Sequence, residues 1–160
     1  MKKKNDADKR KLRIKDAPHP AKVTIRQLPT GVRGLDEITG GGIPEFSFNI
    51  IAGTPGCGKT TMAHQIVFAN ATAQKPALYF TVLGESALKM LRYQQQFSFF
   101  DESKLGKAIR FINLSEVVLG RDLNAVVDEI IKQTTAANPG IVVVDSFAPC
   151  CEQRLAARAK

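Results

Sequence analysis

The sequence predicts an α/β fold in which a parallel sheet is covered by helices on both faces. Short, nearly continuous apolar runs are typical of strands buried on both sides, and they occur at 46–52, 77–83, 109–113 and 141–145. Longer amphipathic stretches between these runs predict helices over 59–73, 86–97 and 123–137. This alternation is the pattern of βαβ units, so we expect the strands to run parallel.

Charge and length divide the chain into a tail and one domain. The 160 residues, 44% of them hydrophobic, suffice for one domain with a buried core. Residues 1–26 carry ten basic and three acidic side chains, which is +7 of the net charge of +8. We therefore expect a basic, disordered tail over 1–26, a nearly neutral domain over 27–147, and an end at 148–160 that matches no recognised element. Such a tail attracts phosphates or anionic lipid non-specifically and identifies no partner.

Membrane and export features are missing from the sequence pattern. No apolar run follows the basic start in the manner of a signal peptide, and none approaches the length of a membrane span. Three cysteines, of which Cys150 and Cys151 are adjacent, form neither a disulfide framework nor a zinc pattern. We expect a cytoplasmic protein without membrane contact.

A glycine-rich segment between the first predicted strand and the first predicted helix fits the pattern G-x-x-x-x-G-K-[ST]. Glycines let backbone N–H groups converge on an anion, and a helix N-terminus adds its positive dipole end. Lys59 supplies a charge to the β- and γ-phosphates, and the Thr60 hydroxyl is placed to ligate Mg²⁺. The predicted nucleotide-binding residues are Gly53, Thr54, Pro55, Gly56, Cys57, Gly58, Lys59, Thr60 and Thr61.

Asp145 ends the apolar run 141–145 and is the second predicted metal ligand. Ligands of open α/β sheets bind at the carboxyl ends of the strands, so this carboxylate can hold Mg²⁺ as a Walker B aspartate. An aspartate is also a common strand terminator, and the metal role depends on the upstream glycine-rich loop.

Two further segments carry a resemblance to a known family. Residues 28–36 read Leu-Pro-Thr-Gly-Val-Arg-Gly-Leu-Asp, and residues 40–44 read Gly-Gly-Gly-Ile-Pro just before the loop. Together with the loop and Asp145, they resemble the RecA-superfamily ATPases of the KaiC/RadA type over about 28–147. The resemblance implies a RecA-like P-loop parallel sheet and ATP and Mg²⁺ as cofactors. It also implies a homo-oligomer, a hexamer by analogy, if the sheet is completed.

The same resemblance implies a role for Glu85. The family places a catalytic glutamate after the strand that follows the P-loop helix, and Glu85 stands there, although Gly84 replaces the first glutamate of a frequent pair. Glu85 is thus the candidate for polarising the attacking water. As an alternative, it is a first-turn acid that stabilises its helix through the dipole.

The end of the chain departs from the family pattern. In the family, a strand after Asp145 inserts between the P-loop strand and the Walker B strand, but residues 146–160 contain no apolar β-rich run. We expect a sheet that is incomplete at its C-terminal end and favour a truncated relative over a complete minimal domain. Because the basic finger and sensor segments would then be missing, we expect slow ATP hydrolysis. The alternatives are an inert nucleotide-binding or assembly module and a KaiC-type autokinase, and nucleic-acid binding stays open.

Overall fold

The computed structural model describes residues 24–82, 87–119 and 123–145. Its elements in chain order are β1 (Gln27–Leu28), α2 (Leu35–Ile38), β2 (Ile43–Pro44), α3 (Lys59–Asn70), β3 (Ala77–Thr81), α4 (Ala87–Gln94), η1 (Glu102–Lys104), β4 (Ile109–Asn113), α5 (Ser115–Leu119), α6 (Leu123–Ala137) and β5 (Ile141–Asp145). The longer strands form a parallel sheet in the order β4-β3-β5, while β1 and β2 pair antiparallel in a separate sheet. The α/β class and its parallel sheet are confirmed.

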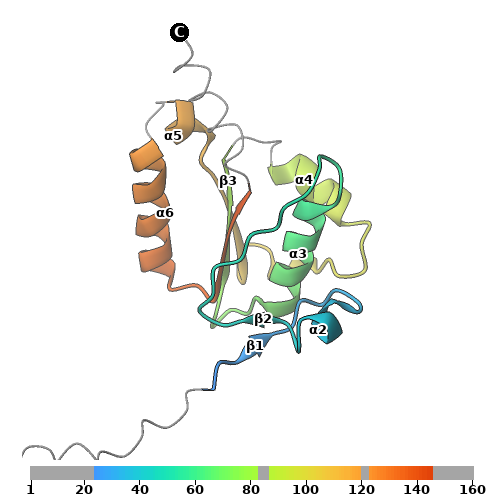
Figure 1. Ribbon diagram of the computed structural model, residues 1–160. Coiled ribbons are helices and arrows are strands. Elements are labelled where there is room, and N and C mark those ends of the chain that lie inside the picture. Colours follow the sequence, from blue (N-terminus) through green and yellow to red (C-terminus); the bar gives the residue numbers. More distant parts are fainter. Residues whose placement is uncertain (1–23, 83–86, 120–122, 146–160) are drawn as a thin grey trace, which may run out of the picture.

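Helices cover both faces of the sheet, as the sequence predicts. Figure 1 shows α3 and α4 on one side of the strands and α5 and α6 on the other. Two buried clusters correspond to these layers. One joins α3 to the odd-numbered positions of β3, and the other joins α5 and α6 to the even-numbered positions.

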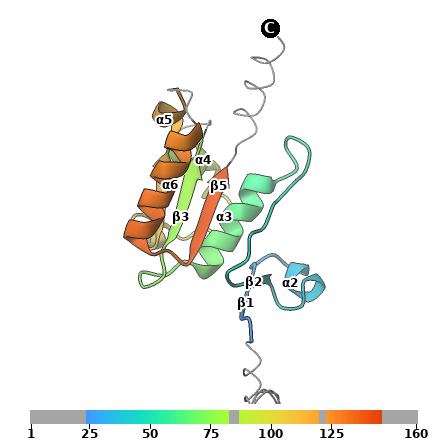
Figure 2. The same cartoon turned by 60° about the vertical axis from the view of Figure 1, so that its left-hand side comes forward.

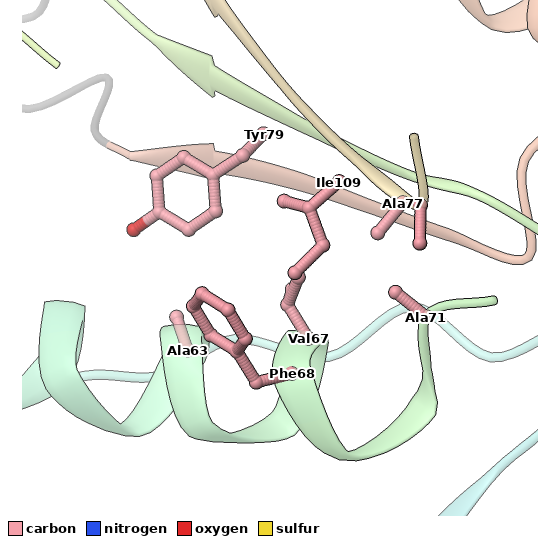
Figure 3. Close-up of a cluster of buried hydrophobic side chains, with 8 residues drawn as sticks. Ala63, Val67, Phe68, Ala71, Ala77, Tyr79 and Ile109 are labelled. Atoms are coloured by element: carbon pink, nitrogen blue, oxygen red, sulfur yellow. The ribbon is translucent and has the colours of Figure 1, made fainter. Parts of the chain in front are cut away.

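The central strand β3 is the core of the fold, because all five of its residues are buried. Ala77 and Tyr79 point toward Ala63, Val67 and Phe68 of α3 (Figure 3). On the opposite face, Leu78 and Phe80 pack with Val126 of α6. Burying one such large apolar side chain contributes roughly 1.5–3 kcal/mol, so this strand carries much of the stability of the sheet.

Three of the seven predicted elements have the observed bounds, and the predicted helix 86–97 ends three residues early, at Gln94. The elements at 109–113, 123–137 and 141–145 agree residue for residue. Helix α3 ends at Asn70, three residues before the prediction, because Ala71 leaves the helical region with a ψ of 132°. Strand β3 ends at Thr81, before the predicted end at 83, because the described residue Val82 lies in a bend. Residues 83 and 86 themselves lie outside the described residues, as do residues 1–23 of the predicted tail and the end at 148–160.

The predicted strand at 46–52 is wrong. The run forms no strand, and the side chains of Phe46, Phe48 and Ile50 are 104%, 89% and 77% exposed. In Figure 2 it is drawn as coil beyond α3, while β5 is the edge strand of the sheet. A strand forms only where a neighbour pairs its backbone groups. Within the described residues, no strand is placed to pair with this run.

Candidate functional site

The glycine-rich loop turns directly into α3. Gly56 and Gly58 have φ angles of 79° and 90°, a region that favours glycine, and Gly58 is the N-cap residue of α3. A Cβ at Gly53 would lie 2.5 Å from the Cys57 sulfur, so a larger residue there would force the Cys57 side chain to shift. A hollow of about 250 Å³ opens over the loop and is lined by Gly56, Gly58, Lys59, Thr60 and Thr61.

The Lys59 ammonium sits on the loop itself. Its Nζ donates hydrogen bonds to the carbonyl oxygens of Gly53 and Thr54, at 3.1 and 2.9 Å. These two hydrogen bonds are exposed, so exchanging their neutral acceptors for phosphate oxygens requires only a local rotation of the side chain. A charge at this point and the first-turn N–H groups of α3 together favour an anion.

The structure brings Thr60 and Asp145 together across 85 residues of sequence. The Thr60 hydroxyl donates to Asp145 Oδ2 at 2.8 Å. This contact exists because α3 lies over β5 and because Asp145 is the last residue of that strand. A hydroxyl and a carboxylate oxygen side by side are hard donors of the kind that Mg²⁺ prefers.

These residues fit a nucleotide-bound Mg²⁺ better than an independent metal site. Among the residues that the structure describes, no group of three or more His, Cys, Asp or Glu side chains could enclose a metal ion. Mg²⁺ in phosphate sites is commonly held by one or two carboxylates together with substrate phosphates and waters. Thr60, which lines the hollow, and its hydrogen-bond partner Asp145 supply that kind of donor set.

Tyr79 belongs to this site, although the sequence analysis missed it. Its hydroxyl donates to the same Asp145 Oδ2, at 2.8 Å. Burial raises the pKa of Tyr79, and the Asp145 charge and hydrogen bond raise it further, so the group stays a protonated donor. The available signal was the two-residue period of a strand, since odd-numbered positions of β3 share a face with Asp145.

His64 lies one helical turn after Thr60 on α3 and is fully buried. Its ring centroid lies 4.4 Å from that of Tyr79 and 5.7 Å from that of Phe111. Burial lowers the pKa of His64 to about 4, against the opposing effects of Gln94 and the Asp145 charge. His64 is therefore a neutral packing residue at pH 7, and among the described residues it belongs to no group of three or more side chains that could hold a metal ion.

The segment before the loop forms a compact hydrogen-bonded turn around Asp36, which we call the Asp36 turn. Asp36 Oδ1 accepts hydrogen bonds from the backbone N–H and the hydroxyl of Thr30, at 2.8 and 2.6 Å, and Thr30 is fully buried. These bonds lower the pKa of the Asp36 carboxyl. A Cβ at Gly42 would lie 2.0 Å from the Leu28 carbonyl oxygen, so only glycine fits there.

The Asp36 turn is hydrogen-bonded to α3, the helix that begins at the end of the glycine-rich loop. The side-chain amide of Gln65 donates to the Gly31 carbonyl, and that of Asn70 donates to the Pro29 carbonyl at 2.6 Å. The residues that carried the family resemblance thus hold the chain against α3.

Glu85 lies outside the described residues, so its predicted role in activating water stays a prediction. Across the described ranges, no helix has the length and apolar character needed to cross a bilayer.

A parallel α/β sheet, a glycine-rich loop that opens a helix and an aspartate at the end of a neighbouring strand define a P-loop nucleotide-binding domain. Comparison with known families gives the same class, because the family described as "ATPase: KaiC" matches residues 28–159. The chain belongs to this KaiC ATPase family and contains a nucleotide-binding ATPase domain.

Several curated relatives share this region. The DNA repair protein RadA of Mycobacterium tuberculosis is 32% identical over 121 residues, which cover 76% of this chain and 22% of that protein. RadA of Pseudomonas aeruginosa is 30% identical over 138 residues, covering 84% and 27%. A UPF0273 protein of Thermotoga maritima is 40% identical over 55 residues, covering 34% and 23%. The matched region thus spans only about a quarter of each relative.

Proposed function

We propose that this domain binds ATP with Mg²⁺ in the hollow over the loop 53–61 and hydrolyses it slowly. The contact between Thr60 and Asp145 carries the proposal, because it joins the two segments that a Mg²⁺–nucleotide site requires. Membership of the KaiC ATPase family and the similarity to RadA support the choice of ATP as the nucleotide.

Each part of the site has a separate task. The N–H groups of the loop and the first turn of α3 bind phosphate oxygens, and Lys59 turns from the Gly53 and Thr54 carbonyls to the β- and γ-phosphates. Thr60 and Asp145 would hold Mg²⁺, which when bound neutralises negative charge on the phosphates. Glu85, by family resemblance, orients and polarises the attacking water.

We further propose that the chain acts as a homo-oligomer, a hexamer by family analogy. The support is family membership. Light scattering of the purified chain with and without Mg²⁺ and ATP tests it, and a monomer under both conditions would contradict it.

The binding proposal is tested by replacing the loop lysine. Lys59→Ala removes the full charge from the hollow while leaving the buried clusters untouched, so we expect ATP affinity to fall at least 100-fold with an unchanged circular dichroism spectrum. The matched control is Lys107→Ala, an exposed lysine in the turn before β4. Equal affinities of Lys59→Ala and the parent chain for ATP would refute the proposed site.

The hydrolysis proposal needs its own readout. Steady-state phosphate release that falls at least tenfold in Glu85→Gln, with ATP affinity retained, supports an ATPase. If the chain binds ATP but its phosphate release does not depend on Glu85, the inert nucleotide-binding module is favoured instead.

A further inference from the structure

Tyr79 reaches the predicted metal ligand from the middle of the sheet. In the parallel register of β3 and β5, Thr81 lies opposite Asp145 and Tyr79 lies opposite Val143. Tyr79 and Asp145 are therefore diagonal neighbours on one face, a separation that an aromatic side chain can span. The hydroxyl covers it with a hydrogen bond of 2.8 Å to Asp145 Oδ2.

The tyrosine and Thr60 hold the same carboxylate oxygen. Thr60 also donates to Oδ2 at 2.8 Å, so both hydrogen bonds described for the Asp145 carboxylate converge on one of its two oxygens. Two donors from different elements, α3 and β3, define the carboxylate plane better than one could.

The ring of Tyr79 has little freedom to leave this position. The side chain is fully buried, and its centroid lies 4.4 Å from the His64 ring and 5.3 Å from the Phe111 ring. Figure 3 shows the ring above α3 with its oxygen pointing out of the apolar cluster. A group locked by packing loses little entropy when it holds a ligand residue in place, which is the property of a good supporting contact.

We propose that Tyr79 is a positioning residue for Asp145, whose hydroxyl fixes the carboxylate in the orientation that serves the Mg²⁺ of the bound nucleotide. This inference rests on the proposed function, because it concerns the same site. It adds that the site extends along one face of the sheet to β3, beyond the loop and the strand end.

The test is Tyr79→Phe, which removes the hydroxyl and keeps the ring. We measure ADP affinity by titration calorimetry in EDTA and at a series of Mg²⁺ concentrations. Loss of an outer contact to a metal ligand commonly weakens metal binding by about 10- to 100-fold. We expect the Mg²⁺ concentration that gives half of the Mg²⁺-dependent increase in ADP affinity to rise by about that factor. ADP affinity in EDTA should change less than about twofold. A merely structural tyrosine would lower both affinities together.

The chain supplies its own matched control. It contains two tyrosines, and the other, Tyr93 on α4, is 59% exposed. Tyr93→Phe should leave both quantities unchanged. If Tyr79→Phe leaves the Mg²⁺ dependence unchanged in a chain that binds ADP with Mg²⁺, the positioning role is wrong and the proposed function survives. If the parent chain binds no nucleotide at all, both are wrong.

A second measurement avoids the loss of the buried hydroxyl, in case Tyr79→Phe does not fold. In Tyr93→Phe, Tyr79 is the single tyrosine of a chain without tryptophan, so the ultraviolet emission reports on the Tyr79 hydroxyl. We expect Mg²⁺ and ADP to change this emission, and we expect Asp145→Asn to abolish that change. An emission that responds equally in both backgrounds, or in neither, would overturn the inference.

Discussion

Two apolar runs of similar composition differ in structure: β3 is a buried strand, whereas the run 46–51 forms no strand and is exposed. β3 pairs with β4 on one side and β5 on the other, and each of its five residues is buried. The run 46–51, Phe-Ser-Phe-Asn-Ile-Ile, pairs with no strand among the described residues and leaves Phe46, Phe48 and Ile50 exposed. Hydrophobic composition alone therefore does not place a segment in the core. A strand also needs neighbours that pair its backbone and cover its faces.

The largest effect should follow from truncating the same residue type in the two runs. Phe80→Ala in β3 empties a fully buried site and is expected to lower the free energy of unfolding by about 3–5 kcal/mol. Phe48→Ala, at a side chain 89% exposed, is expected to change it by less than about 0.5 kcal/mol. Urea unfolding followed by circular dichroism measures both. Comparable losses would mean that the run 46–51 is buried in solution.

The second largest effect is a pH dependence of stability that we expect around β3 and not around the run 46–51. The run 46–51 has no ionisable side chain, whereas β3 lies against buried His64. The folded-state pKa of His64 is lowered from 6.5 to about 4, chiefly by burial, so between these values the unfolded chain binds more protons. Stability from this residue is complete above pH 6.5 and falls by about 3 kcal/mol as the pH drops to 4.

The pH effect is measured as a difference, because carboxylates also lose stability in acid. Asp36, for example, has a lowered pKa, and its contribution is lost in the same direction. His64→Leu removes the titrating ring and keeps an apolar side chain. The parent chain should lose more stability than His64→Leu between pH 7 and pH 4. Parallel pH profiles would show that His64 is not buried in neutral form.

The smallest effect concerns the anchor that precedes the exposed run. Asp36→Ala leaves the N–H and hydroxyl of buried Thr30 without their acceptor, at an expected cost of about 1–3 kcal/mol in unfolding free energy. Glu37→Ala, at the exposed neighbour, is the control and should cost less than about 0.5 kcal/mol. Equal losses of unfolding free energy in Asp36→Ala and Glu37→Ala, measured by thermal or urea unfolding, would mean that the Asp36 turn does not stabilise the segment before the loop.

Local patterns were sufficient where neighbouring residues decide the structure. The 3.6-residue period of 123–137 and the polar ends of the apolar runs at 109–113 and 141–145 predicted those elements at their observed bounds. The strand at 46–52 was wrong because its existence depends on a partner that is not encoded within the run.

The candidate site divides in the same way. Lys59, Thr60 and Asp145 were predicted from local motifs, and the structure brings Thr60 and Asp145 into contact. Tyr79 was missed because a tyrosine inside an apolar run is typical of core packing. Only the β3–β5 register places its hydroxyl on Asp145, and register depends on contacts between segments far apart in sequence.

The most direct measurement is a titration of the unmodified chain with ATP in Mg²⁺ and again in EDTA. We predict saturable binding of one ATP per chain that is at least tenfold tighter with Mg²⁺, because Thr60 and Asp145 would hold the metal that neutralises charge on the phosphates. Absence of saturable binding, or an affinity that Mg²⁺ does not change, would contradict a Mg²⁺–nucleotide site formed by the loop and Asp145.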